Sequence, residues 1–398
     1  MQSLRDESLE LHKVSKGKLS VDLKVKVQTQ KDLSLVYSPG VAEPCKEIYQ
    51  TPDKIYDYTS KGNLVGVVTD GSSVLGLGNI GAGASMPVME GKAALFKAFA
   101  GIDAFPICLN TNDPEQVIQA VKLLEPTFGG INLEDISAPN CFIIEEQLKN
   151  ELNIPVFHDD QHGTAIVTAA GLINALKLVD KKIEEIKIII NGAGAAGIAI
   201  TKLLHHIGAR NIILCDSLGA IYHGRTEGMN KMKESMLELT NQHNNKGTLF
   251  DVIKSADVFL GVSVAGALTS EMVSVMNHNS IIFAMANPVP EIMPEEAKAA
   301  GAMVVGTGRS DLPNQVNNVL AFPGIFKGAL KVQASVINEE MKIAAVYAIA
   351  GLIERDQLTS DYVIPNPFDT RVVEAVSQAV EEAAIKTGVA RKVETLKL

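Results

Sequence analysis

Hydrophobic and polar residues follow a regular rhythm along the chain from Leu64 onward. Short runs rich in β-branched residues end in Gly or Asp, and each is followed by a longer stretch with apolar residues at helical spacing. Strands that alternate with helices in this way predict βαβ units and parallel sheets. In the first half, the pattern predicts strands at 64–69, 104–109, 130–133 and 154–157, and helices at 88–100, 114–124 and 141–149. Asp113 and Pro114 are typical of an N-cap and a first helical residue.

The rhythm resumes after an apolar helix-like run at 162–178 and a polar hinge at 180–185. We predict an α/β protein with an N-terminal α/β domain over residues 1–160 and a C-terminal doubly wound, Rossmann-type domain over residues 161–398. The second domain is expected to hold strands at 186–191, 211–216, 258–261, 281–284 and 303–306, a helix at 195–207, and terminal helices at 338–351 and 372–387.

The first 60 residues show one short alternation of polar and apolar residues, at 20–27, and little else. Such a segment fits an arm or edge strand used in dimerisation as well as it fits a free tail. Its first ten residues are charged and lack the apolar region of a secretory signal. No run of 18 apolar residues predicts a membrane span.

Composition excludes several classes of function. The formal net charge of −10 leaves no basic field to hold a nucleic acid. The four cysteines lie far apart without a C-x-x-C pair, which predicts reduced cysteines and argues against a zinc ribbon or a disulfide framework. We therefore expect a cytoplasmic protein whose partner is a small molecule, with no role for nucleic acid or membrane.

A glycine-rich turn predicts a dinucleotide site. The turn fits G-x-G-x-x-G, follows a strand with a run of isoleucines and opens a helix, the context in which backbone N–H groups hold a pyrophosphate. Its residues are Gly192, Ala193, Gly194, Ala195, Ala196 and Gly197. The next strand ends in Asp216, whose carboxylate can accept hydrogen bonds from the adenosine ribose and disfavours a 2′-phosphate. Ser217 and Leu218 supply no cation, so NAD is favoured over NADP, with Arg225 the nearest residue that could reverse this preference. The alternative is a glycine turn in a purely structural βαβ unit.

Two pairs of carboxylates follow predicted strands. Glu134 and Asp135 come after one strand, and Asp159 and Asp160 come after another. Carboxyl ends of parallel strands meet at one edge of a sheet, and acidic side chains that converge there repel one another unless a cation joins them. An all-oxygen set suits Mg²⁺ or Mn²⁺. The alternative for each pair is a helix N-cap or a solvated turn. The flanking His158 and His162 fit packing or support of the ligands better than metal ligation.

Several segments together resemble the malic enzyme family in its compact bacterial form, in order from about residue 15 to residue 385. They are the segments 37–44 (YSPGVAEP), 69–71 (TDG), 76–81 (GLGNIG), 90–96 (EGKAALF), 133–135 (LED), 157–164 (FHDDQHGT), 287–288 (NP) and 317–324 (NNVLAFPG). The resemblance implies an N-terminal malic-enzyme domain, a Rossmann-type NAD(P)-binding domain and a homodimer or higher homo-oligomer.

The resemblance also implies roles for single residues. Tyr37 would be the general acid and Lys92 the general base, with Asp159 beside them. The metal ligands would be Glu134, Asp135 and Asp160, and Asn287 and Asn318 would contact nicotinamide and substrate. Lys92 lies in an apolar helical run, where we expect desolvation and a nearby cation to lower its pKa. One departure from the larger relatives is Ser72-Ser73, where they carry an arginine that grips the substrate carboxylate.

The activity implied is oxidative decarboxylation of (S)-malate to pyruvate and CO₂, with reduction of NAD(P) and dependence on Mg²⁺ or Mn²⁺. Decarboxylation of oxaloacetate would accompany it. A metal-dependent oxaloacetate decarboxylase that does not oxidise malate is the nearest alternative, and malate-dependent formation of NADH separates the two. A more distant alternative is a non-catalytic, nucleotide-sensing protein.

Overall fold

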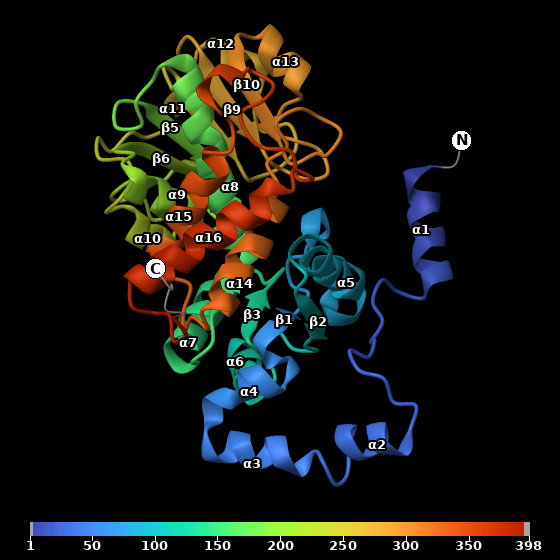
Figure 1. Ribbon diagram of the computed structural model, residues 1–398. Helices are drawn as coiled ribbons and strands as arrows, with labels where there is room; N and C mark the ends of the chain where they lie inside the picture. The colour runs from blue at the N-terminus through green and yellow to red at the C-terminus, as the bar shows by residue number, and fades with distance from the viewer. Residues whose placement is uncertain (1–2, 394–398) are drawn as a thin grey trace.

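Two mostly parallel sheets form the framework of the computed structural model, which describes residues 3–393 (Figure 1). The first sheet has the order β2-β1-β3-β4, and all its strand pairs are parallel. Its strands are β1 (Leu64–Thr69), β2 (Asp103–Cys108), β3 (Gly130–Leu133) and β4 (Val156–His158). The helices that connect them are α5 (Gly81–Ala100), α6 (Pro114–Leu124) and α7 (Asn140–Glu151). As predicted, Asp113 caps α6, accepting the N–H of Glu115, and Pro114 follows it.

The second sheet has the order β10-β9-β8-β5-β6-β7, and only the short edge strand β7 is antiparallel. Its strands are β5 (Lys187–Asn191), β6 (Asn211–Asp216), β7 (Gly219–Ala220), β8 (Val258–Gly261), β9 (Ser280–Ala284) and β10 (Ala302–Thr307). The chain passes from β5 to β6 on one side and later to β8 on the other, so the order reverses between β5 and β8. Open α/β sheets bind ligands at this switch point. The doubly wound, Rossmann-type fold is therefore confirmed.

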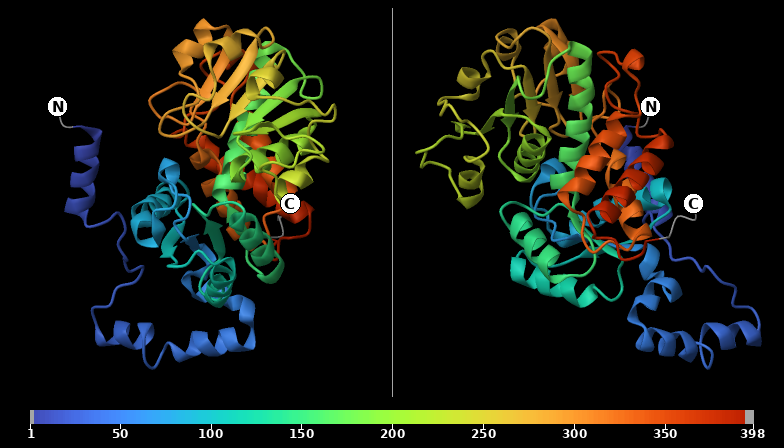
Figure 2. Two further views of the ribbon diagram at one scale, coloured as in Figure 1. Left: turned by 180° about the vertical axis from the view of Figure 1, so that it is seen from behind. Right: turned by 60° about the vertical axis from the view of Figure 1, so that its left-hand side comes forward.

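Helix α8 (Asp159–Val179) joins the two sheets, because it begins directly after β4 and packs against α9 (Ala195–Ile207), β9 and α15 (Glu339–Ala350). Its length and composition would suffice for a membrane span, but 67% of its most apolar window is buried inside the protein, as in a core helix. Figure 2 shows α8 running between the second sheet and the C-terminal helices. The remaining helices are α10 (Lys231–Met236), α11 (Leu249–Ile253), α12 (Ser270–Ser274), α13 (Pro294–Ala299), α14 (Phe322–Lys331) and α16 (Arg371–Lys386).

The C-terminal helices also cover the first sheet, since α14 packs on α5. Four buried phenylalanines form this contact: ring centroids lie 4.7 Å apart between Phe96 and Phe322, 5.3 Å between Phe96 and Phe326, and 5.9 Å between Phe157 and Phe326. Offset and edge-on ring pairs at these separations stabilise a core beyond the area they bury. One ring of this cluster, Phe322, lies against Lys92 in the site described below.

The N-terminal segment extends from the first domain as an arm (Figure 1). It touches α5 through Lys18, whose backbone N–H donates to Glu90 and whose ammonium donates to the carbonyl oxygen of Pro87. It carries α1 (Leu4–Ser15), α2 (Gln30–Val36), α3 (Ala42–Gln50) and α4 (Ile55–Tyr58), with short 3₁₀ turns at Pro52–Lys54 and Ser60–Asn63. The alternation at 20–27 forms no strand. None of the residues in these four helices is buried, although the arm exposes many large apolar side chains.

Candidate active site

A cavity of about 690 Å³ lies where the carboxyl ends of the two sheets face each other. The first sheet contributes the loop after β3, and α5 contributes Lys92. The second sheet contributes the glycine turn before α9 and the loops after β8 and β9. The 3₁₀ turn Asn318–Leu320 closes one side. The topology therefore brings together the predicted dinucleotide turn and the predicted acidic cluster in one space.

Glu134, Asp135 and Asp160 each offer a carboxylate oxygen within 4.8 Å of the others. The Asp135 N–H donates to Asp160 Oδ2 at 2.7 Å, which fixes one carboxylate against the loop that carries the others. Asp135 Oδ2 is buried and has no hydrogen-bond partner. Burial raises the pKa of Glu134 well above its usual value, and burial together with the charge of Asp160 raises the pKa of Asp135 to about 7. Three carboxylates that repel one another, one of them with an unpartnered buried oxygen, fit a hard divalent cation.

Lys92 lies beside this cluster with its Nζ 2.5 Å from Asp159 Oδ2 and 2.9 Å from Glu134 Oε1. Its ammonium also stands over the ring of Phe322, 4.3 Å from the centroid. Burial lowers the pKa of Lys92, but the charges of Asp159 and Glu134 raise it by more, so the net shift is upward. Burial acts in the expected direction, but the two carboxylates reverse the net shift. The chain holds a salt-bridged ammonium there, because the two carboxylates outweigh desolvation.

Asp159 is fully buried and receives hydrogen bonds from two sides. Its Oδ2 accepts from Lys92 and from Asn318 Nδ2, the latter at 3.0 Å. Gly163, one turn along α8, makes room for this carboxylate, since a Cβ there would lie 1.9 Å from Asp159 Oδ1. The sequence alone does not reveal this role of Gly163, because its close approach to Asp159 arises only in the folded helix.

The second sheet supplies amide and hydroxyl groups to the other side of the cavity. The cavity is lined by Asn287, Asn317 and Asn318. The resemblance implied that two of them, Asn287 and Asn318, contact nicotinamide and substrate. Asn318 Oδ1 accepts a hydrogen bond from Thr164 Oγ1 at 3.2 Å, which orients the amide toward Asp159. A Cβ on Gly76 would lie 2.7 Å from the carbonyl oxygen of Asn287, so the Gly76 loop packs closely on this side of the cavity.

The glycine turn has the geometry of a pyrophosphate cradle. Gly192 has φ +119°, and a Cβ there would lie 2.4 Å from the carbonyl oxygen of Val262, across the switch point. A Cβ on Gly197 would lie 1.7 Å from the carbonyl oxygen of Gly192, so only glycine lets α9 start so close to β5. Nothing lies within 4 Å of a Cβ on Gly194, which leaves space for a phosphate group.

Comparison with known proteins agrees with this geometry. The malic enzyme N-terminal domain matches residues 16–116 and 110–149, and the malic enzyme NAD binding domain matches residues 161–389. The chain belongs to the malic enzyme family. It is 69% identical to the bifunctional malic/malolactic enzyme of Bacillus subtilis, covering 98% of this chain and 95% of that protein. It is 59% identical to the NAD-dependent malic enzyme of Geobacillus stearothermophilus, covering 94% and 78%. Relatives named NADP-dependent or probable NADP-dependent malic enzymes match at 49–54% identity.

A solved malic enzyme from Pyrococcus horikoshii superposes on this structure with a TM-score of 0.93 at 48% identity, covering 98% of this chain and 93% of that one. The predicted family and its two-domain fold are thus confirmed.

The position expected for the adenosine ribose holds two cations. Arg225 donates to both carboxylate oxygens of Asp216 at 2.7 Å, and Lys233 Nζ lies 2.7 Å from Oδ2. The N–H of Leu218 donates to Oδ1 at 2.9 Å. Burial raises the pKa of Asp216, but Lys233 and Arg225 lower it by more, so the carboxylate stays ionised. Arg225 was anticipated as a modifier of the coenzyme preference. Lys233 was missed, because it reaches Asp216 only through the fold of α10.

Tyr37 and the Ser72-Ser73 pair, both noted in the sequence, also have defined positions in the structure. Tyr37, at the end of α2, is 69% exposed and is absent from the cavity lining of its own chain. Ser72 donates from its hydroxyl to Asp70 and accepts the N–H of Ser137, which fixes the loop after β1. Among the residues that the structure describes, Lys92 is the only lysine or arginine that lines this cavity.

Proposed function

We propose that this malic enzyme oxidises (S)-malate at C2 and releases CO₂ to give pyruvate, with NAD as the preferred coenzyme and Mg²⁺ or Mn²⁺ as the metal. One observation carries the proposal. A lysine with a side chain only 10% exposed contacts two carboxylates and lines the same cavity as three potential metal ligands and the glycine turn of a dinucleotide site. The family assignment supplies the reaction, and this constellation supplies the groups that the reaction needs.

The residues that would hold the metal are Glu134, Asp135 and Asp160. Their oxygens lie close enough to share one ion, and the unpartnered Asp135 Oδ2 supports the assignment. A divalent ion bound there would polarise the oxygen on C2 of the substrate and stabilise negative charge as CO₂ leaves. Zinc is disfavoured because the set offers only oxygen.

Lys92 and Asp159 form the proton-transfer pair. With only 2.5 Å between Nζ and Oδ2, a proton can pass between them, so Asp159 can accept the ammonium proton and leave Lys92 as the base for the C2 hydroxyl. Asn318 donates to the same Asp159 oxygen and holds it in place. The amides of Asn287 and Asn318 would orient the nicotinamide and the substrate.

Asp216 favours NAD, because a carboxylate at the ribose repels a 2′-phosphate. Arg225 and Lys233 weaken this preference, since two cations against one carboxylate leave that cluster with a net positive charge. We therefore propose NAD as the preferred coenzyme, with NADP accepted at lower efficiency.

Tyr37 can act as the general acid only if it comes from a second copy of the chain. Within its own chain it is exposed and lies outside the cavity, on an arm whose apolar side chains lack cover. Leu33, Leu35 and Val36 are exposed beside it, and burial of such a surface is the usual driving force of stable dimerisation. We propose a homodimer in which the arm of each chain completes the site of the other.

Initial rates with malate test the proposal. NAD and NADP are compared in parallel, with Mn²⁺ and with EDTA, and NADH formation is followed at 340 nm. We expect metal-dependent NADH formation with a higher kcat/KM for NAD. Decarboxylation of oxaloacetate without any malate-dependent NADH would favour the lyase alternative and overturn the proposal.

We propose a cytoplasmic location, which fits a nicotinamide-dependent enzyme of central carbon acids.

A second activity is favoured by the 69% identity to a bifunctional malic/malolactic enzyme. Malate would be converted to pyruvate, CO₂ and NADH, and the same bound NADH and a proton would then reduce pyruvate to lactate, which regenerates NAD. Lactate formed from malate with NAD present only in catalytic amount would support this activity. Pyruvate as the sole product under those conditions would exclude it.

A further inference from the structure

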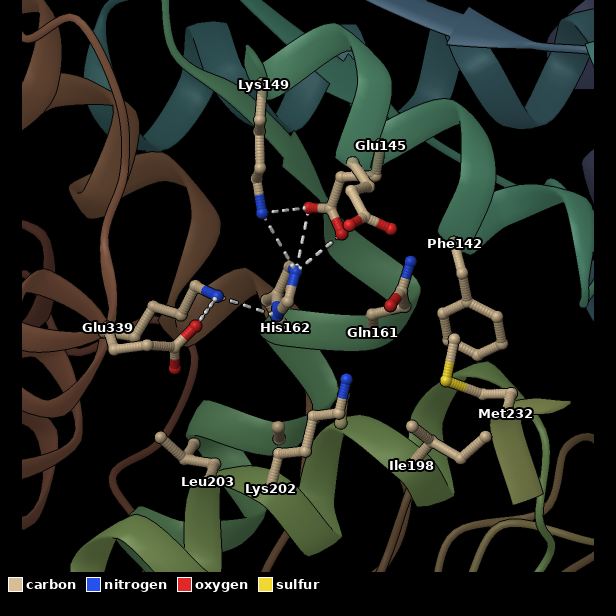
Figure 3. Close-up of a pocket in the computed structure, with 14 residues that line it drawn as sticks. Phe142, Glu145, Lys149, Gln161, His162, Ile198, Lys202, Leu203, Met232 and Glu339 are labelled. Atoms are coloured by element: carbon tan, nitrogen blue, oxygen red, sulfur yellow. Dashed lines mark hydrogen bonds and ion pairs between the residues drawn. The ribbon is translucent and has the colours of Figure 1, made fainter. Parts of the chain in front are cut away.

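A buried polar network lies at the first turn of α8 in a second cavity, whose described lining residues differ from those of the substrate cavity (Figure 3). Its centre is Glu145 on α7, a side chain only 7% exposed. Three donors converge on this carboxylate: His162 Nε2 at 2.8 and 2.9 Å, Lys149 Nζ at 2.7 Å and the backbone N–H of His158 at 3.1 Å. The residue is therefore a fully engaged acceptor inside the protein.

The network continues into the C-terminal helices. Lys342 on α15, with a side chain only 3% exposed, has its Nζ 3.1 Å from His162 Nδ1 and 2.7 Å from a carboxylate oxygen of Glu339. An ammonium can only donate, so Nδ1 accepts and the ring proton sits on Nε2, from which it is donated to Glu145. His162 is therefore held as one tautomer between two fixed partners.

This network brackets the groups that carry the chemistry. Glu145 binds the backbone of His158, directly before Asp159 and Asp160, and the side chain of His162, two residues after Asp160. The N-cap of α8 has no side-chain hydrogen bond of its own, so the helix start depends on outside partners. Burial raises the pKa of Glu145, but His162, Lys149 and Lys342 lower it by more, which keeps the carboxylate ionised and able to accept all its bonds.

We propose that Glu145, together with His162 and Lys342, is a positioning group that fixes the first turn of α8 and thereby aims Asp159 at Lys92 and Asp160 at the metal. The inference rests on the proposed metal site. It assigns to α7 and α15 a part in metal affinity, although neither helix supplies a ligand. Residues that hold a metal ligand in its binding orientation raise the metal affinity, because a ligand that has to reorient on binding lowers the free energy gained.

Glu145→Gln is the main test, because the amide keeps the shape of the side chain but cannot accept a bond from every donor around it. Mn²⁺ binding is measured on the full chain by electron paramagnetic resonance of the free ion, without substrate. We expect the Kd for Mn²⁺ to rise about tenfold, the lower range for groups behind a metal ligand. Lys342→Met, which releases His162 Nδ1, should raise the Kd in the same direction. Glu146→Gln, an exposed neighbour on α7, should change neither Kd nor activity.

A second readout separates positioning from mere structural support. We expect NAD affinity to stay unchanged in Glu145→Gln, and saturating Mn²⁺ to restore most of kcat while the KM for Mn²⁺ stays raised. An unchanged Mn²⁺ Kd in a folded Glu145→Gln protein would overturn the inference. If that variant does not fold, Lys342→Met decides by the same criterion. Failure of the wild-type chain to bind Mn²⁺ would instead refute the proposed metal site.

Discussion

Replacement of Lys92 by methionine is the sharpest test of the proposed chemistry. The change keeps the length and the apolar stem of the side chain and removes the ammonium that contacts Asp159 and Glu134. Lys92 is the only positive side chain that faces these carboxylates from the cavity lining within the described residues. The variant therefore removes the proposed base and, at the same time, the counter-charge of a buried acidic cluster.

The two effects have separate magnitudes. Loss of a general base lowers kcat by about 10² to 10⁴-fold. Loss of one partner of a buried ion pair costs roughly 3–5 kcal/mol in the free energy of unfolding. Because burial already raises the pKa of Glu134 and of Asp159, both carboxyls can take up protons in the variant, so we expect the lower end, about 3 kcal/mol, without metal. Mn²⁺ should recover much of this stability, since it supplies the missing positive charge.

The assay has three parts: malate-dependent NADH formation, NAD binding by fluorescence, and urea unfolding with EDTA or with Mn²⁺. We expect turnover to fall while NAD binding remains. Lys97→Met on the same helix is the matched control, because its side chain is exposed and pairs with Asp103 at the surface. Malate oxidation within tenfold of the wild-type rate would refute the role of Lys92. Equal destabilisation with EDTA and with Mn²⁺ would refute the account of its charge.

Three further predictions follow from other parts of the chain. Tyr37→Phe should lower pyruvate formation by about 10²-fold or more as expected for a lost general acid, and heterodimers mixed from Tyr37→Phe and Lys92→Met chains should regain activity if the arm serves the partner's site. Arg225→Gln should raise the NAD to NADP ratio of kcat/KM about tenfold, since both charge-assisted bonds from Arg225 to Asp216 are lost; an unchanged ratio would exclude the cation pair as a determinant. Burial lowers the pKa of Lys61 to about 8. Between this pH and the higher pKa of Lys61 in the unfolded chain, the unfolded chain binds more protons, so Lys61 makes the free energy of unfolding rise with pH. The free energy of unfolding of the wild type, relative to Lys61→Met, should therefore be larger at pH 9.5 than at pH 7.5.

Several strands and helices with a strong apolar rhythm were predicted to the residue, although the helix predicted at 88–100 begins earlier, at Gly81. β1, α6, α9 and β6 begin and end where the pattern placed them. Between β6 and β10, in contrast, the short helices α10–α13 and the edge strand β7 were missed, because elements of two to six residues carry too few positions to show a period. The helical arm was also missed, since its apolar residues stay exposed in the described part of the chain and therefore show no buried face at helical spacing. The domain limits at residue 160 stay a prediction.

The acidic cluster was predictable because its position follows from topology alone. Glu134 and Asp160 stand at the ends of adjacent parallel strands, so the sheet brings them together whatever the details of packing. Lys92 and Tyr37 had no such signal, and only the family resemblance pointed to them. Lys233 contacts Asp216, and Lys342 contacts His162, only because of the way several helices pack. No local pattern encodes such contacts.

The position of α8 explains why one short stretch of sequence serves both halves of the reaction. Its first turn follows β4 of the first sheet, so Asp160 faces the loop after β3, where Asp135 donates its N–H. The next turns face the second sheet, where Thr164 binds Asn318 and Thr168 contacts Met285. The first turn of α8 therefore sets the direction of the proposed metal ligand Asp160, whereas Thr164, further along the helix, orients an amide on the other side of the cavity. Glu145 holds the first turn, which is the reason to expect that it influences metal affinity from outside the cavity while NAD binding stays unchanged.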